Sequence, residues 1–201
     1  MEDAQKFSLI VLAGGKSSRM KMNKALLEIG DKRLIEVIID SLKGAFDEVI
    51  VVTNTPQEYS FLPYKLVGDI YKDRGPLGGI HVGLKQARNK YALITACDMP
   101  FVESALAKKL CMLAVGYDVV VPKKGDYLQP LFAVYSKNCL PHIETCLKEG
   151  KNKIITFYPS VKILYADWDS LLEPGEAQKI FFNVNTPKDL DALKKFNLGE
   201  E

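Results

Sequence analysis

The fold is decided by residues 9–27, which read LIVLAGGKSSRMKMNKALL. The segment begins as an apolar run, typical of a strand buried in a parallel sheet, and this run breaks at Gly14 and Gly15. The polar residues that follow include four cations, Lys16, Arg19, Lys21 and Lys24. Adjacent glycines let backbone N–H groups approach an anion closely, and cations neutralise phosphate charge. The segment therefore predicts a strand that leads into a phosphate-binding loop.

Two common phosphate-binding loops do not fit these residues. A Walker A loop needs a glycine five residues before Gly15, and Ile10 occupies that position. A dinucleotide-binding fingerprint needs separated glycines, whereas here the first two are adjacent and Ser18 stands where the third is required. The loop therefore belongs to another class of nucleotide-binding protein.

Length and composition favour one globular domain over residues 1–201. The chain is 47% hydrophobic, enough for a sizeable core, and its formal net charge of +2 does not indicate a general nucleic-acid or membrane binder. The N-terminus lacks the pattern of a signal peptide, and no apolar run approaches the ~20 residues that span a bilayer. We expect a soluble, cytoplasmic protein without nucleic-acid or membrane partners.

The four cysteines contain no Cys-x-x-Cys pair, which argues against common zinc-ribbon and redox motifs. Cys139, His142 and Cys146 have a spacing that one helix would place along one side, as in a zinc site. Because Ile143 and Leu147 share that side, the favoured interpretation is that the cysteines are small core residues with His142 at the margin.

Hydrophobic patterns predict strands that alternate with helices, which is the order of an α/β fold. The predicted strands are 9–12, 48–53, 65–67, 91–96, 118–122, 128–135, 162–165 and 180–187. The predicted helices are 34–42, 80–88, 103–115 and 137–148, followed by a last helix that Thr186 would cap. Residues 9–53 form a strand–helix–strand unit, so the first two strands are expected to be parallel neighbours.

Polar residues follow several of these predicted strands. Asp98 comes after the apolar strand 91–96, and Pro100 prevents that strand from continuing. Ligands of open α/β sheets bind at the carboxyl ends of the strands, so Asp98 is the first candidate for a metal ligand. The glycine-rich segment 75–79 precedes a predicted helix and would expose N–H groups to a nucleotide.

Several motifs occur in order along the chain: Leu12-Ala13-Gly14-Gly15, Arg19-Met20, Lys24, residues 75–79, Cys97-Asp98-Met99-Pro100 and Asn183-Val184-Asn185-Thr186-Pro187. Together they resemble the molybdenum cofactor guanylyltransferases, a branch of the GT-A-like nucleotidyltransferases, over nearly the whole length. The resemblance implies a single-domain, three-layer, Rossmann-like α/β fold with a mostly parallel central sheet. It also implies a nucleotide-binding N-terminal half (about 7–115) and a pterin-facing C-terminal half (about 116–197).

The resemblance assigns roles to matching positions. The nucleotide would contact Leu12, Ala13, Gly14, Gly15, Lys24, Asn54, Asp69, Gly78 and Asp98. Arg19 and Lys24 would stabilise phosphate charge and Asp98 would bind Mg²⁺, which makes these three the expected catalytic residues. Gln129, Asn183 and Asn185 would face the pterin substrate.

The implied reaction transfers GMP from GTP to the terminal phosphate of molybdopterin. Transient contacts with molybdenum-insertion proteins or acceptor molybdoenzymes are implied as well. Two alternatives stay open: cytidylyl transfer from CTP to the same pterin or to another small phosphorylated acceptor, and a non-catalytic nucleotide-binding regulator. Retention of both Lys24 and Asp98 argues against the regulator.

Overall fold

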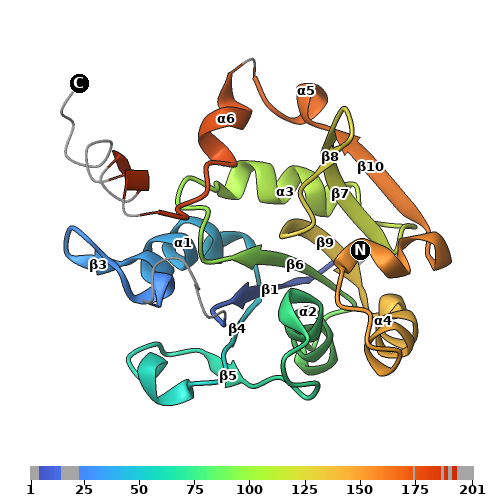
Figure 1. The fold of residues 1–201 in the computed structure, drawn as a ribbon. Coiled ribbons are helices and arrows are strands. Elements are labelled where there is room, and N and C mark those ends of the chain that lie inside the picture. The colour runs from blue at the N-terminus through green and yellow to red at the C-terminus, as the bar shows by residue number, and fades with distance from the viewer. Residues whose placement is uncertain (1–4, 15–22, 174, 187, 190–191, 194–201) are drawn as a thin grey trace.

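In a computed structural model, the chain forms three layers, with helices on both faces of a central sheet (Figure 1). The structure describes residues 5–14, 23–173, 175–186, 188–189 and 192–193. The strands are β1 (Phe7–Leu12), β2 (Glu28–Ile29), β3 (Lys32–Arg33), β4 (Glu48–Val52), β5 (Lys65–Val67), β6 (Tyr91–Ala96), β7 (Val119–Lys124), β8 (Tyr127–Leu128), β9 (Phe132–Ser136) and β10 (Ile163–Asp167). The α-helices are α1 (Leu34–Leu42), α2 (Gly75–Gln86), α3 (Ser104–Met112), α4 (Leu140–Lys148), α5 (Trp168–Leu171) and α6 (Glu176–Ile180). Short 3₁₀ helices are η1 (Lys24–Leu26), η2 (Lys43–Ala45), η3 (Pro56–Tyr59), η4 (Lys137–Cys139) and η5 (Ile154–Ser160).

The main sheet has the strand order β10-β7-β9-β6-β1-β4-β5, and β8 pairs with β7. β1 lies parallel to β4, as the strand–helix–strand pattern predicts, and it is also parallel to β6. β9 runs antiparallel to its neighbours β6 and β7, while β10 is parallel to β7. The sheet is therefore mostly parallel, and the predicted fold class is confirmed.

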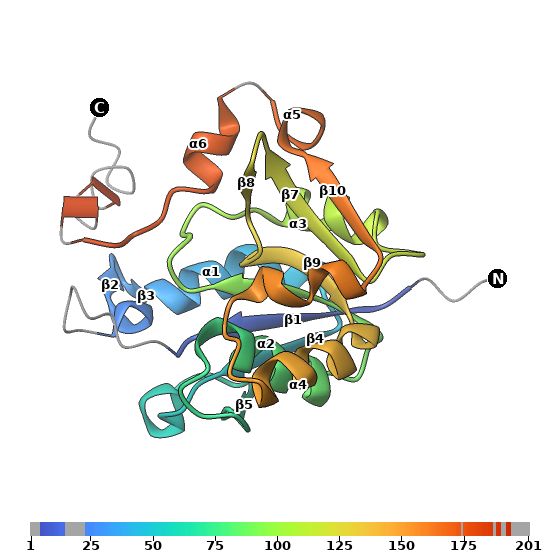
Figure 2. The ribbon, with the colours of Figure 1, turned by 45° about the vertical axis from the view of Figure 1, so that its right-hand side comes forward.

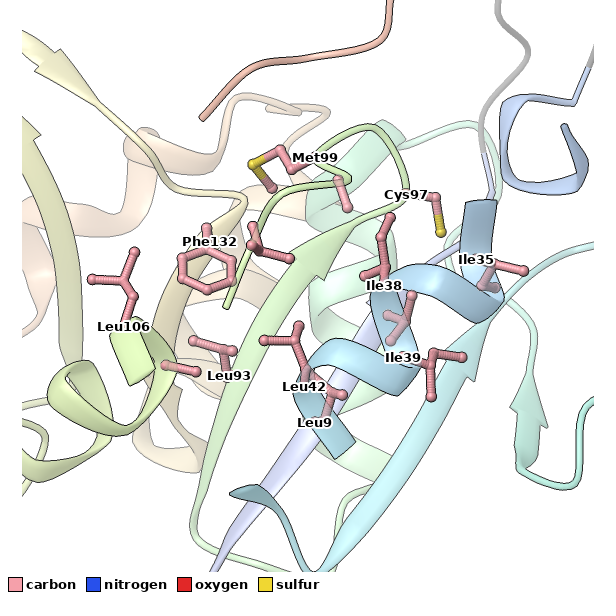
Figure 3. Close-up of a cluster of buried hydrophobic side chains, with 14 of the residues drawn as sticks. Leu9, Ile35, Ile38, Ile39, Leu42, Leu93, Cys97, Met99, Leu106 and Phe132 are labelled. Atoms are coloured by element: carbon pink, nitrogen blue, oxygen red, sulfur yellow. The ribbon is translucent and has the colours of Figure 1, made fainter. Parts of the chain in front are cut away.

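Helices α1 and α3 cover one face of the sheet (Figure 3). The buried residues of α1 recur with helical spacing: Leu34, Ile35, Ile38, Ile39 and Leu42. Burying an aliphatic side chain of this size stabilises a fold by about 1.5–3 kcal/mol, so this face fixes α1 against the sheet. At the N-terminus of α1, the Arg33 backbone N–H donates a hydrogen bond to the Glu36 carboxylate at 2.9 Å, which stabilises the first turn of the helix. The predicted bounds of α1 are confirmed.

Helices α2 and α4 cover the opposite face of the sheet (Figure 2). The sequence predicts that the helix before β6 starts at Ile80, but α2 begins at Gly75. A Cβ atom at Gly79 would lie 3.1 Å from Leu12 Cδ2, and one at Gly83 would lie 2.5 Å from Ile10 Cγ2. These two glycines therefore permit close packing of α2 on β1, rather than forming a loop before the helix.

The segment after α6 does not form the strand predicted over 180–187. This segment lies beside the loop that follows β6, and β6 itself is hydrogen-bonded to β1 on one side and to β9 on the other. The Val184 N–H instead donates to the Asp98 carbonyl at 2.8 Å. The Thr186 hydroxyl accepts the Asp189 N–H at 3.2 Å, which confirms the predicted helix cap.

The four cysteines are buried and unpaired. Cys139 and Cys146 lie in the core between the sheet and helices α2 and α4. This confirms the prediction that these cysteines are small core residues. The described residues contain no group of three ligating side chains suited to a metal ion. In the same part of the chain, every helix is too short or too polar to cross a lipid bilayer.

Candidate nucleotide-binding site

Four adjacent parallel strands bring the candidate site residues to one edge of the sheet. Leu12 of β1 is in register with Val52 of β4 and Ala96 of β6, and Val52 is in register with Val67 of β5. These four residues are also the last residues of their strands. Two residues after the ends of β1, β4, β5 and β6 stand Gly14, Asn54, Asp69 and Asp98, respectively. The shared register therefore explains why residues far apart in the sequence meet at the carboxyl edge.

A cavity of about 230 Å³ lies at this edge, between the end of β1, η1 and the N-terminus of α2. Its lining contains five of the predicted site residues, namely Leu12, Ala13, Gly14, Lys24 and Asp98. The other lining residues are Asn23, Ala25, Pro76, Ala96, Cys97 and Leu131. The cavity thus combines exposed backbone, one cation and one carboxylate, which is a lining suited to a phosphorylated ligand.

The electrostatics of the cavity centre on Asp98 and Lys24. Burial raises the pKa of the Asp98 carboxyl, and the positive charge of Lys24 opposes that rise. The Lys24 Nζ donates to the Asn185 Oδ1 at 2.7 Å, so it joins the first part of the chain to the C-terminal segment. Burial likewise raises the pKa of the neighbouring Cys97 thiol, which keeps that thiol neutral. Among the described residues, the cavity therefore offers one partly buried carboxylate and one cation for ligand charge.

A smaller hollow of about 20 Å³ adjoins this cavity, with Leu12, Gly14 and Pro76 lining both. Asn54 and Asp69 line the smaller one and bind each other twice. The Asn54 Nδ2 donates to the Asp69 Oδ2 at 2.9 Å, and the Asp69 N–H donates to the Asn54 Oδ1 at 2.9 Å. The second carboxylate oxygen, Asp69 Oδ1, is buried and has no hydrogen-bond partner among the described residues. Buried polar atoms normally have such a partner, so this unsatisfied oxygen makes the Asn54–Asp69 pair a candidate binding position.

The first turn of α2 also contributes to both hollows. Pro76 lines the cavity, and Gly75, Pro76 and Gly79 line the smaller hollow. Gly78, predicted to contact the nucleotide, lies outside the lining of both. A Cβ at this position would lie 3.1 Å from the Tyr71 carbonyl and 3.3 Å from Arg74 Cβ, so Gly78 permits close packing of the preceding segment.

The three predicted substrate-binding residues lie in different surroundings. Asn185 reaches the cavity through its contact with Lys24, on the side of the molecule where the segment after α6 runs (Figure 2). Asn183 donates from Nδ2 to the Phe181 carbonyl at 3.0 Å. Gln129 is 5% exposed and lies in the break between β8 and β9, where the sequence predicts one continuous strand. Neither Asn183 nor Gln129 is among the residues that line the two hollows.

Two predicted residues, Gly15 and Arg19, lie outside the described part of the chain. Sequence reasoning missed Asn23 and Tyr59, whose side chains bond to each other next to the cavity. Asn23 precedes the predicted Lys24, which was an available signal. Tyr59 stands in a polar segment after Pro56, and no local pattern indicates its contacts.

The mostly parallel sheet and the cavity at its polar carboxyl edge define an α/β protein with a ligand site at the strand ends. The chain belongs to the MobA-like NTP transferase family, whose domain model matches residues 9–161. It is therefore a nucleotidyltransferase of the α/β class, as the sequence predicts.

Relatives in this family match most of the chain. A protein of Pelotomaculum thermopropionicum named "Probable molybdenum cofactor guanylyltransferase" is 44% identical over 90% of this chain and 88% of its own length. A "Molybdenum cofactor guanylyltransferase" of Syntrophotalea carbinolica is 33% identical over 96% of this chain and 92% of its own. The crystal structure of molybdopterin-guanine dinucleotide biosynthesis protein A from Archaeoglobus fulgidus superposes with a TM-score of 0.84 at 26% identity, over 96% of this chain and 99% of that chain.

Proposed function

We propose that this chain transfers GMP from GTP to the terminal phosphate of molybdopterin and releases pyrophosphate. Relatives named for this activity support the proposal, because they match nearly the full length of the chain. The single structural observation that carries it is the row formed by Gly14, Asn54, Asp69 and Asp98 at one sheet edge. Lys24 lines the same cavity, so backbone, amide, carboxylate and cation meet where a nucleoside triphosphate would bind.

The reaction needs little covalent assistance from the protein. A phosphate monoester has a second pKa near ~6, so the pterin phosphate is largely a dianion at neutral pH. One of its oxygens forms a bond to the α-phosphorus of GTP, and the bond between that phosphorus and the β-phosphate oxygen breaks. Pyrophosphate leaves with the bonding electron pair, so no general base is required. The protein must align the reacting groups and neutralise their charge.

The residues of the cavity supply this alignment and charge. The backbone of Leu12, Ala13 and Gly14 lies along the nucleotide, and Gly14 brings no side chain between the backbone and the ligand. Lys24 neutralises charge on the phosphates, and the N-terminus of α2 adds its positive dipole end. We assign a second phosphate contact to Arg19. Two hydrogen bonds hold Asn54 and Asp69 together, and we assign this pair to the nucleotide.

Asp98 fits the role of a magnesium ligand. Mg²⁺ is usually held by one or two carboxylates together with substrate phosphates, so a single carboxylate in the cavity is sufficient. Asp98 lines the cavity and is partly buried, where its charged form gains from a cation. Bound there, Mg²⁺ would stabilise negative charge on the phosphates of GTP.

The acceptor is placed on the side of the C-terminal half, about residues 116–197. Asn185 is bonded to Lys24, so a phosphate that binds beside Asn185 lies next to the same cation as the nucleotide. We assign Asn183 and Gln129 to the pterin, with the ring rather than the phosphate as their target. This division places the two substrates on opposite sides of Lys24.

Nucleotide selectivity tests the proposal without the pterin. We expect calorimetry of the full chain with Mg²⁺ to give binding of GTP at least about tenfold tighter than that of CTP, UTP or ATP, a discrimination of about 1.4 kcal/mol. Omitting Mg²⁺ should weaken GTP binding, because phosphate charge is then less well neutralised. Preference for CTP would make the reaction cytidylyl transfer. Absence of binding by every triphosphate would refute the nucleotidyltransferase role of the cavity.

A further inference from the structure

The Tyr59 side chain connects two parts of the nucleotide cavity. Tyr59 ends η3 and is 0% exposed. Its hydroxyl donates to the Ala13 carbonyl at 2.7 Å, and it accepts a hydrogen bond from the Asn23 Nδ2 at 2.9 Å. Both partners line the cavity, and in the sequence they stand on either side of residues 15–22.

One hydroxyl satisfies both contacts. Its single proton bonds the Ala13 carbonyl, and a lone pair of the oxygen accepts from Asn23. Burial raises the pKa of Tyr59 to about 12, so the hydroxyl keeps its proton at neutral pH. The pair of bonds is therefore intact under conditions in which the enzyme would work.

Further hydrogen bonds make both partners of Tyr59 rigid. The Ala13 N–H donates to the Val52 carbonyl at 2.8 Å, so both polar atoms of this residue are held. The Asn23 Nδ2 also donates to the Glu58 Oε2 at 2.8 Å, which ties Asn23 to η3 a second time. Asn23 immediately precedes η1, which begins at Lys24. The hydrogen bonds that hold Asn23 therefore also determine the position of the Lys24 backbone.

We propose that Tyr59 is a positioning residue for the nucleotide, whose hydroxyl sets the separation of Ala13 and Asn23 and thereby the placement of Lys24. This proposal rests on the proposed function, since the positioned groups are those assigned to GTP. Tyr59 acts through Ala13 and Asn23. Its loss leaves the buried Ala13 carbonyl without this donor and releases Asn23 from one of its two ties.

The test compares Tyr59→Phe with a matched variant, Tyr158→Phe, in the full chain. Tyr158 is also buried, and its hydroxyl lies 3.0 Å from the Tyr135 hydroxyl, in the core on the opposite face. We expect Tyr59→Phe to raise the Kd and KM for GTP about tenfold, the effect of losing one or two net hydrogen bonds. The KM for molybdopterin should rise less than the KM for GTP, because Lys24 lies beside the acceptor phosphate as well, whereas Ala13 is assigned to the nucleotide alone. Tyr158→Phe should lower the melting temperature similarly and leave GTP affinity unchanged.

A double-mutant cycle separates positioning from a general loss of structure. Because Tyr59 acts through Asn23, the variant that carries both Tyr59→Phe and Asn23→Ala should bind GTP about as well as the weaker of the single variants, rather than with multiplied losses. Wild-type affinity for GTP in Tyr59→Phe would overturn the proposal, as would equal increases in both KM values. If Tyr59→Phe does not fold, unchanged GTP affinity in Asn23→Ala overturns it. Failure of the wild-type chain to bind GTP would instead refute the proposed function, so the two failures are distinguishable.

Discussion

Replacing Asp98 with asparagine is expected to reduce GMP transfer by about 10³-fold, the size of effect that follows loss of a group stabilising transition-state charge. Asparagine keeps the shape of the side chain but removes the charge that would bind Mg²⁺ and balance Lys24. The measurement is pyrophosphate release from GTP with molybdopterin at saturating Mg²⁺. Near-normal turnover by Asp98→Asn would contradict the metal-binding assignment.

The same substitution is expected to stabilise the free protein. Burial raises the pKa of Asp98, so the folded state holds the proton more tightly than the unfolded state does. At pH values above the folded pKa the carboxyl is ionised in both states, and its burial then lowers the free energy of unfolding. Asparagine removes that cost. Asp98→Asn should therefore melt at a higher temperature than the wild type near pH 7, with a smaller difference near pH 4.

Asp40→Asn is the matched control for this prediction. Hydrogen bonds from Lys32 and Lys43, at 2.6 and 2.7 Å, lower the pKa of Asp40. Its stabilising effect is present above the ordinary carboxyl pKa and is lost as the pH falls through the lower folded value. Asp40→Asn should therefore reduce the melting temperature at pH 7 and leave turnover unchanged, the opposite of the result for Asp98→Asn.

Replacing Lys24 with methionine is expected to lower kcat/KM for GTP by about 10²-fold. Methionine preserves much of the length of the side chain but removes its charge and its hydrogen bond to Asn185. The charge of Lys24 holds the pKa of Asp98 below the value that burial alone would give. In Lys24→Met, the acidic limb of the remaining activity should therefore shift to higher pH, because Asp98 must be ionised to bind a cation.

Lys43→Met provides the control for Lys24→Met, since it removes the same charge from an exposed pair with Asp40. It should leave both kcat/KM and the acidic limb unchanged. Steady-state kinetics from about pH 3.5 to pH 8 measure both quantities, a range that includes ordinary and raised carboxyl pKa values. An unshifted acidic limb in Lys24→Met would show that Lys24 and Asp98 do not interact during turnover.

The arrangement of the nucleotide side could be predicted from sequence because it depends on strand ends. Buried parallel strands have recognisable apolar runs, and the polar residues that follow them mark a common sheet edge. Gly14, Asn54, Asp69 and Asp98 each follow such a run, and the observed register places them at equivalent positions. Local sequence was sufficient here because the sheet supplies the long-range order.

The C-terminal side was predicted less well because tertiary structure overrides local pattern there. Residues 180–187 have the composition of a strand, but the Val184 N–H bonds to the Asp98 carbonyl in the loop after β6. Phe181 instead packs against Trp168, with ring centroids 4.4 Å apart. The contacts of Tyr59 likewise join its hydroxyl to the Asn23 side chain, 36 residues away, and to the Ala13 carbonyl, 46 residues away, and no local motif records them.

The central claim is tested most directly by incubating the wild-type chain with molybdopterin, Mg²⁺ and each nucleoside triphosphate in turn, with pyrophosphate and the pterin product both measured. The account predicts equal amounts of pyrophosphate and a guanine dinucleotide form of the pterin from GTP, with little product from CTP, UTP or ATP. Tight GTP binding without release of pyrophosphate in the presence of molybdopterin would contradict it and would favour a nucleotide-binding regulator.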